Sequence, residues 1–297
     1  LIRDIMAMNK MNVLHWHLVD SESFPYVSTT FPQLSQVGAY SSRHVYTPKT
    51  IRDILQYARI RGIRVIPEFD LPGHTGSWKG QPELLTECFD ASKKPTYQNL
   101  VDPSKEENFE FLTKFFSEVV NAFPDDFLHL GGDEVADYIT ECWKVLNVKI
   151  QDFMKRKSFG NNTTLLENYF FDRVAEIIKN LPSKRRMVFW QEVFDNNKPN
   201  GSIIQVWKGN THEEILREVK AVTAKGFNVI VSACWYLNYI KYGADWKDET
   251  AGSSPSNSRS LFKRLSSIFS QHLTLLLKST DGKELETNEQ QRKEMAI

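Results

Sequence analysis

The sequence predicts an α/β fold, a parallel (β/α)8 barrel that is incomplete within this chain. Along most of the 297 residues, the spacing of apolar side chains switches repeatedly between strand and helix periods. That alternation is typical of parallel strands covered by helices. Polar or aromatic residues follow nearly every predicted strand, and no glycine-rich phosphate-binding turn follows any of them. A barrel brings all its strand ends to one mouth, so it explains these residues better than an open sheet does.

The predicted elements begin with a helix over residues 1–11, which carries an apolar stripe, and a strand over 12–20. The next helix spans 47–62, with Thr47 as its N-cap and Gly62 as its stop. The same alternation then predicts strands at 63–70, 127–135, 186–194, 202–209 and 227–238, and helices at 106–123, 163–181 and 211–226.

Six strands are predicted, whereas a complete barrel has eight. The first helix already begins at Leu1, so we expect the first barrel strand to lie upstream of this chain. After Trp246 the alternation ends in a Ser-rich stretch, and no closing strand is evident. We therefore divide the chain into a partial catalytic barrel, residues 1–247, and a divergent, poorly ordered tail, residues 248–297.

The composition excludes several classes of partner. Lys and Arg total 37, as do Asp and Glu, so the net charge is zero. No global field therefore favours nucleic acid or an anionic membrane. No apolar run is long enough to span a bilayer. The chain begins at Leu1 rather than Met and carries no signal peptide, so we expect it to be a fragment.

Three cysteines, Cys88, Cys142 and Cys234, allow one disulfide and one free thiol. Cys88 and Cys142 lie in loops after two successive predicted strands and could meet above the mouth, or they could be unrelated buried thiols. If the protein is secretory, glycan acceptors are expected at Asn161, Asn162 and Asn200.

The stretch FLHLGGDEV, residues 127–135, ends an apolar run on two adjacent carboxylates, Asp133 and Glu134. Like charges this close repel each other, so one of them is expected to resist ionisation, which suits acid–base chemistry. The alternative is that both are solvated and cap a following helix. The two glycines favour the functional interpretation, because they let a ligand or a second backbone come close.

Aromatic residues also follow several predicted strands. A single Trp is more often a core residue than a binding residue. Aromatic faces can however stack on the apolar face of a sugar ring, while carboxylates and amides bind its hydroxyls. A carbohydrate pocket is therefore indicated by the recurrence of such residues at successive strand ends, namely Trp190, Trp207 and Trp235–Tyr236.

His15 and His17 lie two apart on one predicted strand and so face the same side. His-x-His is a metal-ligand spacing in barrel hydrolases, and His74, His129 and Asp133 could complete such a site. We favour the alternative of inward histidines satisfied by hydrogen bonds, because nothing fixes the other ligands. We therefore expect neither a metal nor another cofactor, and metal-dependent hydrolysis remains the second chemistry.

Six motifs together resemble the catalytic barrel of glycoside hydrolase family 20, and most closely its animal lysosomal members. The likeness runs in the same order from about residue 1 to about residue 247. The combination is far more specific than GGDE alone. The motifs are NVLHWHLVDSESFPY, GIRVIPEFDLPGHTGSW, LHLGGDEV, FWQEVFD, IIQVW and WYLNYIKYGADW.

The resemblance implies a retaining exo-β-N-acetylhexosaminidase that removes terminal β-linked N-acetylglucosamine or N-acetylgalactosamine from glycans or glycolipids. In this family the substrate's own 2-acetamido oxygen attacks the anomeric carbon, an exception to the two-carboxylate scheme. Glu134 matches the general acid that protonates the leaving oxygen. Asp133 matches the carboxylate that holds the acetamido N–H and stabilises the developing positive charge.

The resemblance also implies roles around the sugar. Trp190 and Trp207 match walls of the box that encloses the acetamido methyl, and Tyr236 matches the hydroxyl that donates to the acetamido oxygen. Asn238 lies where the family contacts the outer hydroxyls. Tyr239 follows it, in place of the Arg with which some isoenzymes favour negatively charged substrates.

Supporting positions match as well. Asp20 and His74 match polar residues that support the acid, and Cys88 with Cys142 match a family disulfide. The resemblance further implies a lysosomal or extracellular setting. It also implies a homo- or heterodimer, with no nucleic-acid partner and no membrane span.

The chain departs from the family at both ends. The family's substrate-binding Arg belongs to the strand upstream of Leu1, and the last-strand Trp and Glu find no match in residues 248–297. The polypeptide by itself is therefore expected to fold poorly or to be nearly inactive. The alternative from another class is a catalytically silent sugar-binding barrel.

Overall fold

The structure is a computed structural model that describes residues 2–144, 147–196, 201–209 and 211–233. The chain divides into two compact units. The larger comprises Leu1–Lys208 and Leu216–Ser232, and the sheet and the candidate site belong to it. The smaller comprises Gly209–Ile215 and Ala233–Ile297 and includes the start of helix α9 (His212–Ala224). Within the described ranges, no helix is long and apolar enough to cross a membrane.

Six parallel strands form one sheet in which each strand pairs with the next along the chain. This sequential order is that of a barrel wall, and it confirms the predicted parallel α/β architecture, an incomplete barrel. Among the described residues, β1 and β6 each have one strand neighbour. The strands are β1 (Val13–Val19), β2 (Arg64–Phe69), β3 (Phe127–His129), β4 (Arg186–Trp190), β5 (Ile203–Val206) and β6 (Asn228–Val231).

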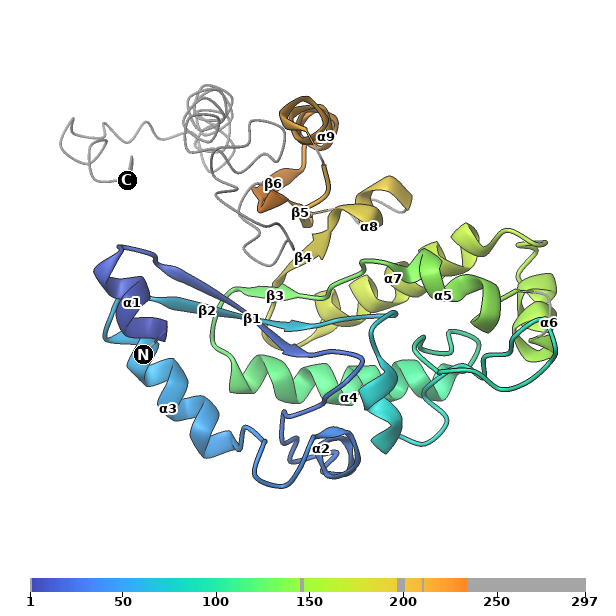
Figure 1. Cartoon of the computed structure of the whole chain (residues 1–297), viewed down its shortest axis with the longest axis horizontal. Coiled ribbons are helices and arrows are strands. Elements are labelled where there is room, and N and C mark those ends of the chain that lie inside the picture. Colours follow the sequence, from blue (N-terminus) through green and yellow to red (C-terminus); the bar gives the residue numbers. More distant parts are fainter. Residues whose placement is uncertain (1, 145–146, 197–200, 210, 234–297) are drawn as a thin grey trace, which may run out of the picture. The chain divides into compact units, whose positions relative to one another are not determined.

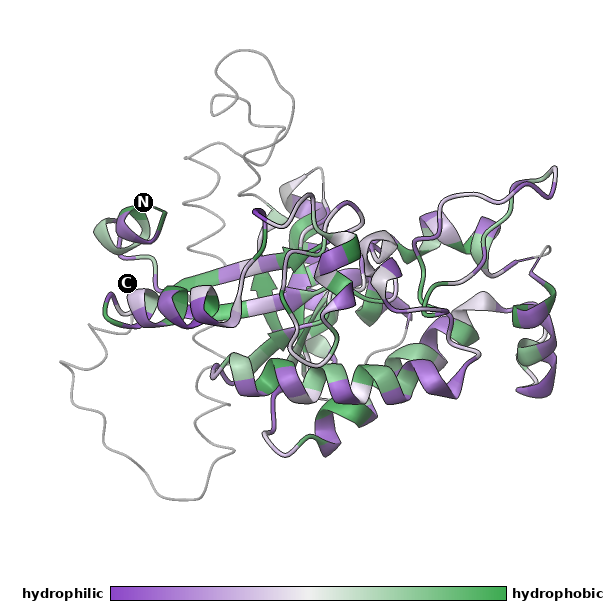
Figure 2. Ribbon diagram, turned by 90° about the horizontal axis from the view of Figure 1, so that it is seen from below, coloured by the Kyte–Doolittle hydropathy of each residue, from purple (hydrophilic) through white to green (hydrophobic). Residues whose placement is uncertain are grey.

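Helices connect successive strands. In Figure 1, α3 (Pro48–Arg59) and α4 (Glu106–Ala122) lie on one side of β1–β3, and α4 contacts both α3 and α7 (Thr163–Asn180). The helices are banded purple and green in Figure 2, as expected for elements with one buried face. The N-cap predicted at Thr47 is confirmed, since its side chain accepts the backbone N–H of Thr50 at 3.2 Å.

Two predicted strands are too long, and the reason is local. Residues 127–135 were predicted as one strand, but β3 ends at His129, and α5 (Val135–Cys142) starts where the strand was expected to end. Gly131 and Gly132 lie between them with φ of 66° and 97°, values that no strand accommodates. Likewise β4 ends at Trp190, and the rest of the predicted strand forms α8 (Gln191–Asn196).

Short helices within the connections carry too little periodicity to predict. They are α2 (Gln33–Gly38), the 3-10 turn η1 (Gly76–Gly80) and α6 (Val148–Arg156), while α1 (Ile2–Met8) agrees with the predicted first helix. The predicted last strand, 227–238, begins as β6, and its residues from 234 on lie outside the described ranges, as does the predicted tail.

A cluster of aromatic side chains fills the space between the sheet and α4. Phe69 at the end of β2 meets Phe115 edge to face, with ring centroids 5.2 Å apart. Phe115 also contacts Phe24 and Trp78 from the loops that follow β1 and β2. This core therefore fixes the loops that carry the candidate site residues against the sheet.

Glu118 on α4 anchors the connection after β1. Its carboxylate accepts hydrogen bonds from the Tyr26 hydroxyl at 2.9 Å, the Ser28 hydroxyl at 3.0 Å and the Thr30 backbone N–H at 2.7 Å. The hydroxyl and the N–H of Thr29 add two more at 3.0 Å. One carboxylate thus satisfies both backbone and side-chain donors of the loop that leaves β1.

We predict that Glu118→Gln lowers the free energy of unfolding by about 2 kcal/mol, because an amide nitrogen would replace an oxygen that faces only donors. Urea unfolding followed by circular dichroism measures the loss. Glu110→Gln, an exposed position on the same helix, is the control and should change stability by less than about 0.5 kcal/mol. Equal effects of the two substitutions would contradict the anchoring role of Glu118.

Candidate active site

The strand register brings the predicted site residues to one end of the sheet. Across the β1–β2 pair His17 lies opposite Glu68, and Glu68 lies opposite His129 on β3. Residues just beyond these strands therefore emerge side by side. Asp20 follows β1, His74 follows β2, and the Asp133–Glu134 pair follows β3.

The fully buried carboxylate of Glu68 is the centre of the cluster. Its Oε2 lies 2.6 Å from His15 Nε2 and 2.9 Å from His17 Nδ1. Its Oε1 accepts the indole N–H of Trp190 at 2.8 Å and lies 3.2 Å from His129 Nδ1. Four side chains from three other strands thus converge on one carboxylate.

The charges in this cluster are set by mutual contact. Burial by itself would raise the pKa of Glu68, but His129, His15 and His17 outweigh it and hold that pKa well below its ordinary value. Burial likewise disfavours a charged His17, yet hydrogen bonds from its ring to Asp20 and Glu68 raise its pKa to about 10. His17 is therefore an imidazolium between two carboxylates.

A chain of contacts runs outward from this cluster, from Asp20 through His74 to Asp133 and Glu134. His17 Nε2 is 2.7 Å from Asp20 Oδ2, and His74 Nδ1 is 3.2 Å from Asp20 Oδ1. The other ring nitrogen, His74 Nε2, lies 3.3 Å from Glu134 Oε2 and 3.7 Å from Asp133 Oδ2. The carboxylates of Asp133 and Glu134 therefore both lie close to the same imidazole ring.

Opposing effects set the pKa values along this chain of contacts. For Asp20, burial raises the pKa, but His17, His74 and the Ser21 N–H outweigh it and lower that pKa strongly. For His74, burial lowers the pKa, but Asp20 and the charge of Asp133 raise it above its ordinary value. Asp20 is thus held as a carboxylate, and its charge favours the protonated form of His74.

Glu134 and His74 share an unusual backbone geometry. Both have φ of 54°, the left-handed region that residues other than glycine rarely adopt. Such strain is characteristic of functional sites. Glu134 occupies the N-cap position of α5, but its side chain makes no capping hydrogen bond and is 40% exposed. The helix-capping alternative therefore does not account for this carboxylate.

The two glycines permit a close approach, and at Gly131 the predicted second backbone is among the close atoms. A Cβ on Gly131 would lie 1.7 Å from Asp70 Oδ1, and a Cβ on Gly132 would lie 2.3 Å from Val193 Cγ2. They make room for neighbouring side chains and, at Gly131, for the backbone of Asp70, whose Cα would lie 2.8 Å from an added Cβ. Because neither glycine has a side chain, the loop that carries Asp133 and Glu134 can lie directly on the end of β2.

Trp190 and Trp207 form an aromatic corner beside the cluster. Their ring centroids are 6.1 Å apart in an edge-to-face arrangement. The Trp207 indole donates to Glu192 Oε2 at 2.9 Å, and its backbone N–H donates to Gln191 Oε1 at 2.9 Å. Both rings are thus oriented by hydrogen bonds at their edges.

The residues of the metal alternative fall into two separate groups. His15, Glu68 and His129 place one potential ligand atom each within 4.8 Å of one another, and so do Asp70, His74 and Asp133. The oxygens of Glu68 already accept hydrogen bonds from the surrounding rings, so a cation would have to displace those protons. For His15 and His17 the structure therefore favours hydrogen bonding over metal binding. His74 Nε2 and His129 Nε2 are buried and have no hydrogen-bond partner among the described residues.

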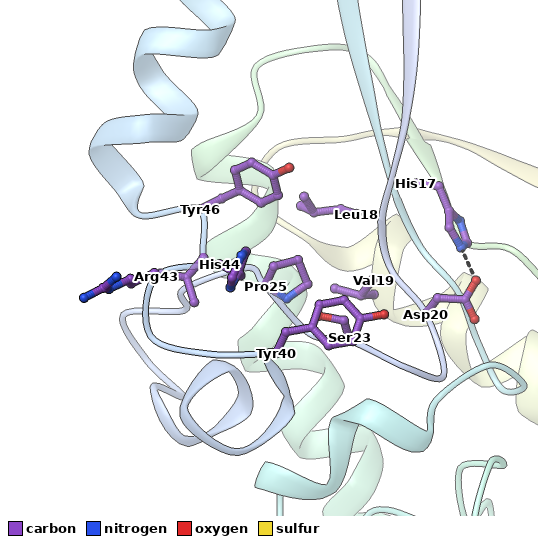
Figure 3. Close-up of a pocket in the computed structure, with 11 residues that line it drawn as sticks. His17, Leu18, Val19, Asp20, Ser23, Pro25, Tyr40, Arg43, His44 and Tyr46 are labelled. Atoms are coloured by element: carbon purple, nitrogen blue, oxygen red, sulfur yellow. Dashed lines mark hydrogen bonds and ion pairs between the residues drawn. The ribbon is translucent and has the colours of Figure 1, made fainter.

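A cavity of about 480 Å³ borders the cluster on the other side of β1. Figure 3 shows the His17–Asp20 ion pair at its edge and the Tyr40, His44 and Tyr46 side chains across it. The cavity includes neither carboxylate of the adjacent pair. It gives water access to the ion pair and is distinct from the aromatic corner.

Other predicted positions are distributed as follows. Cys88 and Cys142 form a disulfide that joins the connection after β2 to the end of α5. Asn161 and Asn162 are exposed, and the Asn162 side chain caps α7 by accepting the Thr164 N–H at 3.0 Å. The predicted residues that lie outside the described ranges are Asn200, Cys234, Trp235, Tyr236 and Asn238.

Glu68 and Asp70 are the site residues that the sequence did not single out as functional. Asp70 is the last residue of the predicted strand 63–70, but the sequence pattern gives it no role. For Glu68 the available signal was a charged residue inside an apolar strand, IRVIPEFD, directly after a proline. A buried carboxylate needs partners, and the two same-facing histidines of the preceding strand supply them.

Fold and site together define a barrel-type catalytic domain with an acidic, aromatic-lined mouth. Comparison with known proteins agrees, since the family described as glycosyl hydrolase family 20, catalytic domain, matches residues 2–289. The chain belongs to this family.

Named relatives are closely similar over most of the chain. It is 65% identical over 258 residues to "Beta-hexosaminidase A" of Caenorhabditis briggsae, covering 86% of this chain and 47% of the relative. It is 51% identical over 249 residues to "Beta-hexosaminidase subunit beta" of Mus musculus, covering 82% and 45%. The chain therefore spans about half the length of these relatives.

Solved structures share the fold. An exo-β-N-acetylglucosaminidase from Vibrio harveyi, determined in complex with N-acetylglucosamine, superposes with a TM-score of 0.63 at 26% identity. The superposition covers 77% of this chain and 37% of the bacterial one.

The raised pKa of His17 predicts a specific pH dependence of stability. Because its folded pKa of about 10 exceeds the ordinary 6.5, its contribution is complete below about pH 6.5 and disappears as pH rises through about 10. The difference in unfolding free energy between wild type and His17→Gln should therefore be larger at pH 6 than at pH 10. Urea unfolding at several pH values measures it, with His44→Gln as the control for loss of an imidazole. A difference that is constant with pH would contradict the ion pair.

Proposed function

We propose that the protein is a retaining exo-β-N-acetylhexosaminidase that hydrolyses terminal β-linked N-acetylglucosamine or N-acetylgalactosamine by substrate-assisted catalysis. The observation that carries the proposal is the convergence of Asp133 and Glu134 on His74, at 3.7 and 3.3 Å. Membership of glycosyl hydrolase family 20 supports it, as do the names of the relatives and the bacterial structure bound to N-acetylglucosamine.

Glu134 is the proposed general acid. Its side chain is exposed enough to reach a glycosidic oxygen, and its Oε2 lies within 3.3 Å of His74 Nε2. The His74 ring is anchored at Nδ1 by Asp20 and places its Nε2 beside Glu134. Glu134 recovers its proton from the water that opens the cyclic intermediate, so the cycle needs no other proton source.

Asp133 is the proposed partner of the substrate's acetamido group. In this reaction the acetamido oxygen attacks the anomeric carbon, the bond to the leaving oxygen breaks, and Glu134 protonates that oxygen. The ring that forms carries positive charge on the former amide. A carboxylate on the amide N–H orients the nucleophile and stabilises this charge, which is the role we assign to Asp133. Water then opens the ring, with Glu134 as the base.

The aromatic residues provide the proposed sugar-binding surface. We assign the apolar ring faces of Trp190 and Trp207 to the acetamido methyl group and the sugar ring. Tyr236 and Asn238 are assigned to the acetamido oxygen and the outer hydroxyls. The hydrogen bond from Trp190 to Glu68 couples this surface to the charged cluster.

The setting that we propose is lysosomal or extracellular. The Cys88–Cys142 disulfide supports it, because such bonds persist in oxidising compartments. Glycans at Asn161, Asn162 or Asn200 would accompany that setting, and a homo- or heterodimer is proposed as its assembly. Domain limits of 1–247 for the catalytic barrel and 248–297 for a separate tail remain part of the proposal.

We predict that Glu134→Gln lowers kcat for 4-methylumbelliferyl β-N-acetylglucosaminide at least about 100-fold, because the amide cannot protonate the leaving oxygen. Fluorescence of released 4-methylumbelliferone, measured on the protein expressed from its natural transcript, gives the rate. Glu141→Gln, an exposed position on the same helix, is the control and should retain wild-type activity. Activity that survives Glu134→Gln unchanged would reject the assignment.

Substrate assistance makes a further prediction. The 4-methylumbelliferyl β-glucoside, which carries a hydroxyl in place of the acetamido group, should be turned over at least about 1000-fold more slowly, since it lacks the nucleophile. Asp133→Asn should lower kcat for the acetamido substrate and leave the glucoside rate unchanged. Comparable kcat/KM values for both substrates would indicate an enzymic nucleophile instead.

A further inference from the structure

Asp70 is a second buried carboxyl directly beneath the carboxylate pair. It follows β2, is 1% exposed, and accepts the backbone N–H of Gly132 on Oδ1 at 2.9 Å. The missing Cβ of Gly131 is what lets this carboxyl approach so closely. Asp70 thus lies under the loop that carries Asp133 and supports its backbone.

Two buried oxygens in this region have no ordinary donor. Asp70 Oδ2 and Asp133 Oδ1 are each buried and without a hydrogen-bond partner among the described residues. The two carboxyl groups are nevertheless neighbours, since each places an oxygen within 4.8 Å of an oxygen of the other. If both were ionised, two acceptors would face one another in a buried site. A single proton between them satisfies both atoms.

The surroundings decide which carboxyl holds that proton. Burial raises the pKa of Asp133, but a hydrogen bond from Asp70 and the His74 ring, 3.7 Å away, act in the opposite direction and favour its ionised form. Asp70 is buried near the charges of Asp133 and Glu68, and burial together with these charges raises its pKa well above its ordinary value. Among the described residues, the Gly132 N–H is the contact that stabilises Asp70 as an anion, and a neutral acid can accept the same bond through its carbonyl oxygen.

We propose that Asp70 is a positioning residue, a neutral carboxylic acid whose O–H donates to Asp133 Oδ1 and so fixes the rotamer in which Asp133 meets the substrate. The inference rests on the proposed function for the role of Asp133 toward the acetamido N–H. The acid has the property that the site needs. The neutral acid orients Asp133 without neutralising it. The Oδ2 atom of Asp133 then faces the active-site side.

Substitutions at position 70 separate charge from hydrogen bonding. Asp70→Asn matches the neutral acid in shape, with Oδ1 toward Gly132 and an N–H toward Asp133, so kcat and KM should stay within about threefold of wild type. Asp70→Leu has a similar size and no donor, so kcat should fall about 100-fold with a smaller change in KM. The pH–rate profile of Asp70→Asn should match that of wild type. Loss of activity in Asp70→Asn equal to that in Asp70→Leu, or full activity in Asp70→Leu, would overturn the proposal.

A measurement that needs no activity keeps the inference separate from the proposed function. The Asp70 carboxyl carbon, labelled with 13C-aspartate and assigned by its absence in Asp70→Asn, should keep the chemical shift of a neutral acid at pH 7. A shift that titrates with a midpoint near the ordinary value of 3.8 would overturn the proposal whatever the enzyme turns over. Absence of hexosaminidase activity together with a protonated Asp70 would reject the proposed function alone.

Discussion

The buried carboxylate of Glu68 is the group on which the arrangement of the candidate site depends. It has no access to water, so it must be satisfied by protein donors. Those donors are the ring nitrogens of His15 and His17 on β1 and the indole of Trp190 on β4. Strands on both sides are therefore held in register by one charge, and the acidic side of the mouth is tied to its aromatic side.

From Glu68 outward, negatively charged side chains alternate with imidazole rings. His17 is held as a cation between Glu68 and Asp20, and Asp20 in turn holds His74 against the Asp133–Glu134 pair. Neighbouring charges of opposite sign lower the cost of burying each of them. The strained backbone at Glu134 costs about 1 kcal/mol or more. Around it, α5 is anchored at its far end by the disulfide, and the preceding glycines pack on Asp70.

Much of this could be predicted from sequence, because strand ends converge in a parallel barrel. Asp20, His74, Asp133 and Glu134 come from three separate loops, yet their common place after strands predicts that they meet. The functions of Glu68 and Asp70 could not be predicted, since they depend on which atoms face them across the sheet. The start of α5 at the carboxylate pair was also missed, because two glycines with positive φ turn an apolar run out of the strand. Gly131 and Gly132 make room for particular neighbouring atoms, and the residue type alone does not show which atoms these are.

The most direct test of this account is 15N NMR of the His17 imidazole in wild type and in Glu68→Gln. If Glu68 organises the cluster, His17 in the wild type is an imidazolium at pH 8 and titrates near its pKa of about 10. In Glu68→Gln, where one of the two flanking carboxylates is lost, the His17 pKa should fall well below that value. A neutral His17 ring at pH 8 in the wild type, or a titration unchanged by the substitution, would contradict the central role of Glu68.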